Sequence, residues 1–204
     1  MEKINVTNIV LAGGLSSRMG TNKAELEIGE HTVIERIIKE FEPHTNETII
    51  VTNDLNAYCK HNWKCVSDIY VQKGPLAGIH AGLLGSSNDI NFVISCDMPF
   101  PNSKLITKML RHIHCNDIVV PVINGKLHPL FGVYKKTILS ELINCLEQDN
   151  LRVRKMYEKV STYYITELEL YTDSELEMGI FEIDFFNMNT LDDYSKAKSL
   201  YSEL

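Results

Sequence analysis

Short apolar segments alternate with segments of helical periodicity over the first 150 residues of this chain. Val6–Leu11 and Ile90–Ser95 are continuous apolar runs, which is typical of strands buried on both faces. Between such runs, residues 31–42 carry apolar side chains at helical spacing, and Thr32 with Glu35 forms a capping box. Strands separated by helices need crossover connections. The pattern therefore predicts a single α/β domain with a doubly wound, mostly parallel sheet and helices on both faces.

The other expected elements follow the same rhythm. Further strands are expected at residues 47–53, 64–68 and 117–122, and further helices at residues 76–85, after a Ser103 cap, at residues 138–146 and at the C-terminus. For the last helix we expect a cap by Thr190 and Asp193 and a buried stripe of Leu191, Tyr194, Ala197 and Leu200. After about Asn150 the rhythm fades, and the acidic residues 166–179 are expected to form a surface excursion within one domain spanning residues 1–204.

Composition narrows the classes of partner. The formal net charge of −7 argues against a general nucleic-acid binder, which would carry a basic face. No apolar run approaches the roughly 20 residues needed to span a bilayer. The five cysteines include no CxxC pair. We therefore expect free thiols, a cytoplasmic location, and no membrane or nucleic-acid partner.

A glycine-rich basic turn follows the first strand, in the stretch "NIVLAGGLSSRMGTNKAEL". Gly13, Gly14 and Gly20 allow backbone N–H groups to approach an anion, and Arg18 and Lys23 add positive charge. The spacing matches neither the P-loop nor the dinucleotide-binding fingerprint. The turn predicts a cradle for a nucleoside triphosphate, and the alternative interpretation is an ordinary tight turn between strand and helix.

Two further stretches point to the same edge of the sheet. Asp97, in "FVISCDMPF", follows a buried strand, so its carboxylate is a candidate magnesium ligand facing the triphosphate; the alternative is a turn aspartate before Pro99. The stretch "QKGPLAGIHAGL" keeps a loop and a helix start slim through Gly74, Pro75 and Gly78. It predicts room for a base or ribose, and close helix–sheet packing would use the same small residues.

Five motifs together resemble the molybdenum cofactor guanylyltransferase family of the nucleotidyltransferase superfamily. They are "LAGGLSSRMGTNKAEL", "GPLAGI", "SCDMPF", "HPLFGVY" and "NMNTLDD", and the match covers nearly the whole chain. The resemblance implies a Rossmann-like fold and transfer of GMP from GTP to the phosphate of molybdopterin, the organic part of the molybdenum cofactor, with release of pyrophosphate. It also implies Mg²⁺ and transient contacts with other cofactor-biosynthesis or acceptor proteins.

The resemblance also assigns roles to individual residues. It implies catalytic roles for Lys23, Arg18 and Asp97, with Asp97 binding the metal. The nucleotide site it implies comprises Leu11, Ala12, Gly13, Gly14, Gly20, Lys23, Asn53, Asp68, Gly74, Pro75, Gly78 and Asp97. The pterin side it implies comprises His128, Asn187, Asn189 and the region around Arg152.

Three alternatives remain at the level of the sequence. A cytidylyltransferase acting on the same cofactor would resemble this chain, but that branch tends toward Ala-Ala-Gly where this chain has Ala12-Gly13-Gly14. A sugar-phosphate nucleotidyltransferase would usually carry Gly-Thr-Arg where this chain has Ser17-Arg18-Met19. A non-catalytic nucleotide-binding module would not need to retain both Lys23 and Asp97.

Overall fold

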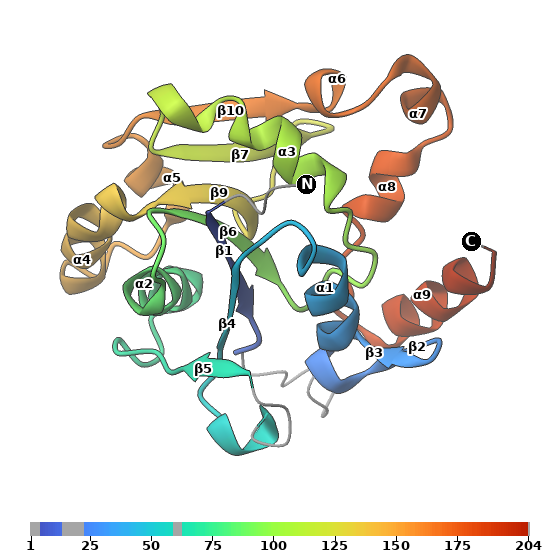
Figure 1. Cartoon of the computed structure of the whole chain (residues 1–204), viewed down its shortest axis with the longest axis horizontal. Helices are drawn as coiled ribbons and strands as arrows, with labels where there is room; N and C mark the ends of the chain where they lie inside the picture. Colours follow the sequence, from blue (N-terminus) through green and yellow to red (C-terminus); the bar gives the residue numbers. More distant parts are fainter. Residues whose placement is uncertain (1–4, 14–22, 59–62, 204) are drawn as a thin grey trace.

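A mixed sheet forms the centre of the protein in the computed structural model, which describes residues 5–13, 23–58 and 63–203 (Figure 1). Within those residues the sheet has eight strands in the order β10-β7-β9-β6-β1-β4-β5, with β8 paired to β7. The strands are β1 (Val6–Leu11), β4 (Glu47–Val51), β5 (Lys64–Val66), β6 (Ile90–Ser95), β7 (Ile118–Ile123), β8 (Lys126–Leu127), β9 (Phe131–Lys135) and β10 (Thr162–Thr166). A separate ribbon pairs β2 (Glu27–Ile28) with β3 (His31–Thr32).

Most strand pairs are parallel, as predicted. Strand β1 runs parallel to both β4 and β6, β4 runs parallel to β5, and β10 runs parallel to β7. Strand β9 lies antiparallel between β6 and β7, and the short β8 is also antiparallel to β7. Strands β8, β9 and β10 and the β2–β3 ribbon were not among the expected elements. The expected strands at β1, β4, β5, β6 and β7 are all present.

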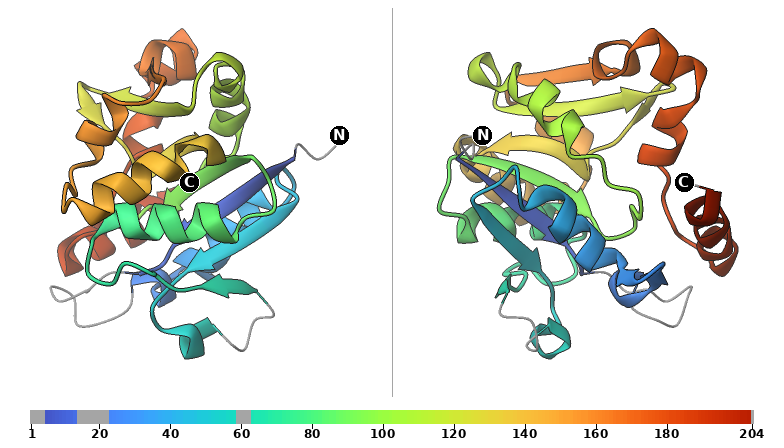
Figure 2. Two further views of the ribbon diagram at one scale, coloured as in Figure 1. Left: turned by 90° about the vertical axis from the view of Figure 1, so that its left-hand side faces the viewer. Right: turned by 45° about the vertical axis from the view of Figure 1, so that its right-hand side comes forward.

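Helices cover both faces of the sheet (Figure 2). Two separate apolar clusters fill the two interfaces: α2 and α4 contribute to one, and α1 and α3 to the other. The helices are α1 (Val33–Phe41), α2 (Pro75–Gly85), α3 (Lys104–Leu110), α4 (Leu139–Glu147), α5 (Val153–Tyr157), α6 (Glu167–Leu170), α7 (Asp173–Glu177), α8 (Ile180–Asp184) and α9 (Leu191–Glu203). Among the described helices, none has the length and apolar character required to cross a membrane.

The predicted helix caps had different outcomes. The capping box of Thr32 and Glu35 is present at the start of α1. Thr190 and Asp193 also bond reciprocally at the start of α9. The cap expected from Ser103 is wrong, because the Ser103 hydroxyl donates to Glu40 Oε1 at 2.6 Å and makes no cap hydrogen bond to α3.

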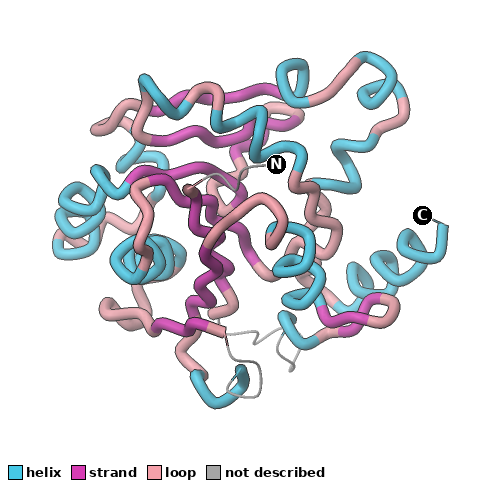
Figure 3. Tube along the Cα trace, in the orientation of Figure 1, coloured by secondary structure: helices cyan, strands magenta, loops and turns pink. Residues whose placement is uncertain are grey.

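The C-terminal third departs most from expectation. The prediction of a mere surface excursion is wrong in part, since the chain first adds edge strand β10 and then buries Leu170 and Tyr171. Helix α9 lies beside the β2–β3 ribbon (Figure 3). Its expected apolar stripe is incomplete: Ala197 is fully buried, but Leu191 is 59% exposed.

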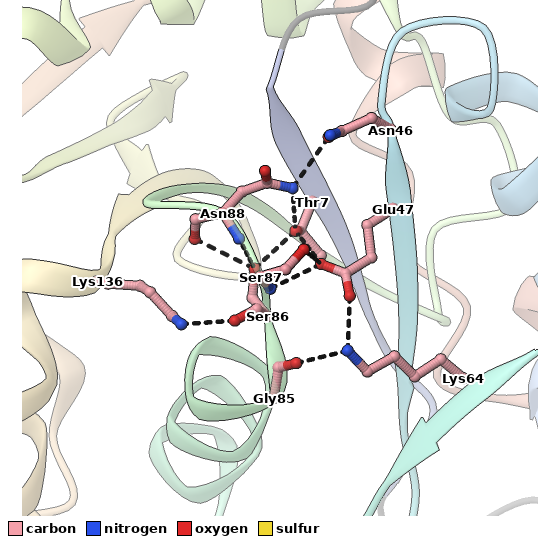
Figure 4. Close-up of polar contacts among 9 residues, drawn as sticks. All are labelled: Thr7, Asn46, Glu47, Lys64, Gly85, Ser86, Ser87, Asn88 and Lys136. Atoms are coloured by element: carbon pink, nitrogen blue, oxygen red, sulfur yellow. Dashed lines mark hydrogen bonds and ion pairs between the residues drawn. The ribbon is translucent and has the colours of Figure 1, made fainter.

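A polar cluster fixes the end of the sheet where β1 and β4 begin (Figure 4). Glu47 accepts hydrogen bonds from the Thr7 hydroxyl and the Ser87 backbone, and its other oxygen lies 2.6 Å from Lys64 Nζ. Lys64 and Lys136 also donate to the Gly85 and Ser86 carbonyls at the C-terminus of α2. Positive charge at this end of the helix complements its dipole, so the cluster anchors α2 to the sheet.

The Glu47 carboxylate should make the stability of the protein depend on acid pH. Partial burial raises its pKa, but the bonds from Lys64, Ser87 and Thr7 outweigh burial and lower the pKa from 4.5 to about 2. The contribution of the Glu47 carboxylate to the free energy of unfolding is therefore fully present above pH 4.5 and is lost as the pH falls toward 2. With allowance for solvent screening of the half-exposed Lys64, we expect Glu47→Gln to cost about 2 kcal/mol at pH 7.

Urea unfolding at a series of pH values tests this expectation. The stability difference between wild type and Glu47→Gln should shrink steadily between pH 4.5 and 2. The exposed Glu30→Gln is the matched control and should follow wild type throughout. A Glu47→Gln difference that stays constant down to pH 2 would contradict the assignment.

Candidate functional site

Four parallel strands end at the same edge of the sheet. Because β1, β4, β5 and β6 share one direction, the residues that follow each of them are neighbours. Backbone hydrogen bonds connect these strand ends: the Ala12 amide donates to the Val51 carbonyl at 2.9 Å, and the Cys96 amide donates to the Leu11 carbonyl at 3.1 Å. Ligands of open α/β sheets bind at this edge. Gly13 is exposed there, directly after β1.

Asn53 and Asp68 face each other across two of these strand ends. Asn53 Nδ2 donates to Asp68 Oδ2 at 3.1 Å, and the Asp68 amide returns a bond to Asn53 Oδ1 at 3.2 Å. This reciprocal pair fixes the orientation of the Asp68 carboxylate. Its second oxygen, Oδ1, is buried and has no hydrogen-bond partner among the described residues. A buried acceptor without a partner is costly, so this oxygen is available to a ligand that donates N–H groups.

Helix α2 begins beside that carboxylate. Gly74 precedes it with φ +66° and ψ −155°, a conformation that only glycine adopts without strain, and Pro75 occupies the first turn. A Cβ at Gly78 would lie 3.3 Å from Leu11 Cδ2 and 3.8 Å from Asp68 Oδ1. Gly78 therefore packs closely against Leu11 near the Asp68 carboxylate, and a larger side chain there would crowd Leu11. The packing alternative also holds further along α2, where a Cβ on Gly82 would lie 2.4 Å from Ile9 Cγ2.

Asp97 lies at the end of β6, between this region and the C-terminal part of the chain. Burial raises the pKa of its carboxyl, against a hydrogen bond from Ser95 and the nearby charges of Lys23 and Lys126. Its Oδ1 is buried and has no partner among the residues described. Its backbone carbonyl accepts from the Met188 amide at 2.8 Å. A buried carboxylate oxygen that lacks a partner fits a cation.

Lys23 connects the N-terminal part of the site to the C-terminal segment that carries Asn189. It begins a short 3-10 helix, Lys23–Glu25, and its Nζ donates to Asn189 Oδ1 at 3.0 Å. Asp193 Oδ2 in turn accepts the Asn189 amide at 2.8 Å. The predicted phosphate-binding lysine and the predicted pterin-side Asn189 are therefore direct neighbours, although 166 residues separate them in the sequence.

His128 and Asn187 differ in how open they are to a ligand. The imidazole of His128 packs edge-on against Phe185, with 4.7 Å between ring centroids. Burial and the Lys126 charge lower its pKa to about 4, so the ring is neutral at pH 7. The Asn187 amide group instead donates to the Phe185 carbonyl at 2.7 Å, within its own segment.

A basic groove lies next to His128 and encloses about 450 Å³. Its lining residues are Lys126, Leu127, Pro129, Arg152, Val153, Arg154, Lys155 and Glu158. Four of these residues are cationic and one is anionic, so the groove favours an anion despite the net negative charge of the chain. Sequence reasoning missed Lys126, whose charge reaches both Asp97 and His128.

Some predicted residues are not part of this geometry. Gly14, Arg18 and Gly20 lie outside the described residues. Within the described ranges, no three His, Cys, Asp or Glu side chains gather to hold a metal. A cation at Asp97 would therefore need oxygens from a bound phosphate, which is how Mg²⁺ commonly binds at nucleotide sites.

Together the edge offers Asp68 with an unpartnered oxygen beside the start of α2, Asp97 with a carboxylate suited to a cation, Lys23 near Asp97, and an adjacent groove that favours an anion. A mostly parallel sheet with these groups at its carboxyl edge has the fold of a nucleotidyltransferase and groups suited to its chemistry, the transfer of a nucleoside monophosphate from a triphosphate to an acceptor.

Comparison with known proteins agrees with this class. Residues 8–162 match the family model described as a MobA-like NTP transferase domain. The probable molybdenum cofactor guanylyltransferase of Peptoclostridium acidaminophilum is 33% identical, over 99% of this chain and 92% of that protein. The molybdenum cofactor guanylyltransferase of Desulfosudis oleivorans is 31% identical, over 95% of each. The chain belongs to the MobA-like NTP transferase family and is an enzyme of that family.

Solved structures show the same fold. Molybdopterin-guanine dinucleotide biosynthesis protein A from Archaeoglobus fulgidus superimposes with a TM-score of 0.81 at 23% identity, over 97% of this chain and 100% of that one. A CMP:2-keto-3-deoxy-manno-octonic acid synthetase superimposes with a TM-score of 0.70 at 12% identity, over 98% and 99% of the two chains. Enzymes that use different nucleotides thus share this fold, so the choice of base depends on the site.

Proposed function

We propose that this protein transfers GMP from GTP to the phosphate of molybdopterin and releases pyrophosphate, forming a guanine dinucleotide cofactor. The observation that carries the proposal is the unpartnered Asp68 oxygen beside Gly78 and Leu11, at the edge that also holds Asp97 and Lys23. The full-length relatives named molybdenum cofactor guanylyltransferase support the same substrates.

Guanine, the base of the nucleotide donor GTP, fits the part of the sheet edge around Asp68. The base carries an N–H and an NH₂ side by side, and a carboxylate can accept both. Asp68 has the oxygens for this, since Asn53 fixes one of them and the other has no partner in the described chain. Adenine and cytosine lack that pair of adjacent donors. They would leave the buried oxygen of Asp68 unpaired, at a cost of about 1–3 kcal/mol.

Molybdopterin, the acceptor of the GMP group, fits the opposite side of this edge, toward the basic groove. Its phosphate would lie between Lys126 and Asp97, with the rest of the molecule along the basic groove that contains Arg152. His128, neutral at pH 7, would present an aromatic face to the pterin, and Asn189 would supply an amide. Asn187 is expected to support this side through its backbone, because its own amide group already bonds to Phe185.

Charge neutralisation is the main task in this reaction. A phosphate oxygen of the acceptor attacks the α-phosphorus of GTP, the bond from that phosphorus to the oxygen bridging to the β-phosphorus breaks, and pyrophosphate leaves. The nucleophile is already anionic at pH 7, so no residue has to remove a proton. Lys23 would bind the triphosphate, and Asp97 would hold Mg²⁺. When bound, the ion supplies positive charge that stabilises the phosphoryl group in the transition state.

A nucleotide panel tests the proposal. Turnover measured with molybdopterin and Mg²⁺ should favour GTP over ATP and CTP by about 100-fold or more in kcat/KM. Asp68→Asn should lower kcat/KM for GTP by about 10- to 100-fold, since it replaces an acceptor oxygen with a donor. Asp54→Asn, an exposed neighbour on the same edge, is the control and should behave as wild type. Equal turnover with CTP would move the protein to the cytidylyltransferase branch.

A further inference from the structure

A buried carboxylate lies outside the site described above, at the end of α8. Asp184 is only 7% exposed, and its Oδ2 accepts two hydrogen bonds: from Asn102 Nδ2 at 2.7 Å and from the Tyr171 hydroxyl at 2.8 Å. These three side chains, here named the Asp184 clasp, come from three separate parts of the chain.

Stability alone is a poor reason to keep this carboxylate. Burial raises the pKa of Asp184, and the charges of Glu175 and Glu40 raise it further. A buried charge without a cationic partner costs free energy, and apolar residues of similar volume often replace buried charged groups without loss of stability. The location of the clasp gives a better reason.

The clasp connects two segments that meet at the site. Asn102 follows Asp97 by five residues, on the loop that leads away from β6. Asp184 directly precedes the segment 185–189, in which Phe185 contacts His128 and the Met188 amide donates to the Asp97 carbonyl. One end of each segment therefore lies in the site, and the clasp joins the two segments a few residues away.

The loop after Asp97 is already fixed on its other side. Arg36 Nε donates to the Pro99 carbonyl at 3.0 Å, and Glu40 accepts from both the backbone and the hydroxyl of Ser103. Both of these partners belong to α1. The Asp184 clasp joins the same loop to α8 through hydrogen bonds, and the rings of Phe100 and Phe186, with centroids 6.2 Å apart, also connect the loop to segment 185–189. The clasp therefore helps to set the separation between the loop and this segment.

We propose that Asp184 is a positioning residue for the acceptor side: through Asn102 and Tyr171 it holds segment 185–189 against Asp97, so that Asn189 and His128 face the acceptor in a fixed geometry. This inference rests on the proposed function for the identity of the acceptor. It assigns Asp184 no contact with substrate.

Asp184→Leu and Asp184→Asn separate positioning from packing. Leucine keeps the branched shape of the side chain, with somewhat larger methyl groups, and removes both acceptor oxygens, whereas asparagine keeps one acceptor oxygen. We expect Asp184→Leu to remain folded but to unfold at a somewhat lower temperature than wild type, because the Tyr171 hydroxyl and the Asn102 amide lose their acceptor. It should lose about 10- to 100-fold in kcat/KM for molybdopterin, with little change in KM for GTP. Asp184→Asn should stay within about threefold of wild type. Glu182→Gln, exposed on the same helix, is the matched control.

Hydrogen exchange at the Met188 amide supplies a second measurement that does not depend on activity. Its bond to the Asp97 carbonyl should open more often in Asp184→Leu, so exchange should be about tenfold faster or more, and should be unchanged in Glu182→Gln. A folded Asp184→Leu with wild-type kinetics and wild-type exchange would overturn the proposal. If Asp184→Leu fails to fold, Asn102→Ala removes the other half of the clasp, and its kinetics and exchange decide in the same way.

The exchange measurement also keeps the two proposals apart. If wild type shows no transfer to molybdopterin, the proposed function fails, and exchange at Met188 still decides whether the clasp holds segment 185–189. If wild type is active and Asp184→Leu is unaffected, the positioning role fails and the proposed function stands.

Discussion

Asp97→Asn is expected to lower kcat for nucleotidyl transfer by about 1,000-fold or more at saturating Mg²⁺, since the charge stabilisation supplied by a bound metal is worth several kcal/mol. Asparagine has the same shape but lacks the charge that holds the cation. Burial raises the pKa of the Asp97 carboxyl, so loss of the charge also removes a desolvation cost. The variant should therefore unfold at the same temperature as wild type or a higher one.

Steady-state kinetics and thermal unfolding together check this result. Asp89→Asn, exposed at the amino-terminal end of β6, should match wild type in both measurements. An Asp97→Asn enzyme with a near-normal rate at saturating Mg²⁺ would show that this carboxylate does not hold the metal.

Lys23→Ala is the second large effect that we expect. Lys23 Nζ lies 3.0 Å from Asn189 Oδ1, and its positive charge offsets part of the rise that burial causes in the pKa of the Asp97 carboxyl. The charge of Lys23 is therefore directed at the centre of the site. Its removal should lower kcat/KM for GTP by about 100- to 1,000-fold, the scale seen when a preorganised group that stabilises transition-state charge is removed. Lys23→Arg should be impaired but less so, because a planar guanidinium does not replace a compact ammonium.

Kinetics with varied GTP distinguish the two parts of this role. A rise in KM alone would mean that Lys23 only binds the triphosphate, whereas a fall in kcat would mean that it also stabilises the transition state. Lys104→Ala, an exposed lysine on α3, is the control. Unchanged kcat and KM in Lys23→Ala would contradict the assignment.

Local patterns in the sequence were sufficient for the central strands. A strand buried on both faces, such as Val6–Leu11, is a continuous apolar run, and the Thr32–Glu35 capping box acts over three residues. Strand β10 gives no such signal, because an edge strand with the exposed Tyr164 needs no continuous apolar run. The Ser103 hydroxyl bonds to Glu40, 63 residues away, and no local pattern reports that competition.

One local signal was missed. Asn124 and Gly125 both have positive φ values, 49° and 71°, and they form the two-residue turn between β7 and β8. Asn-Gly is a strong hairpin signal, and it directs Lys126 back toward Asp97 and His128. The Asn-Gly pair therefore predicts, from the sequence alone, the hairpin that places Lys126 next to the end of β7.

The residues of the candidate site also divide into those that local sequence patterns predict and those whose placement depends on contacts between distant segments. Leu11, Asn53, Asp68 and Asp97 lie at or just after the ends of predicted parallel strands, and strand direction alone brings them to one edge. The contact of Lys23 with Asn189 and the Asp184 clasp join segments that are distant in the sequence. They depend on tertiary packing, which neither periodicity nor spacing encodes.

The antiparallel strand β9 has a consequence for how such enzymes can diversify. Because β9 runs against β6, the residues just before it, His128 to Leu130, lie at the edge where the parallel strands end, and the Ser95 amide bonds to the Leu130 carbonyl there. The strands that precede β6 in the chain, β1, β4 and β5, form one half of the sheet. The strands that follow it, β7 to β10, form the other half, and β6 with Asp97 is the border. Substitutions, insertions or recombination after residue 97 can alter the half formed by the later strands while the half formed by the earlier strands is inherited intact. Under the proposed function the later half is the acceptor side, so new acceptors can evolve on an unchanged nucleotide site.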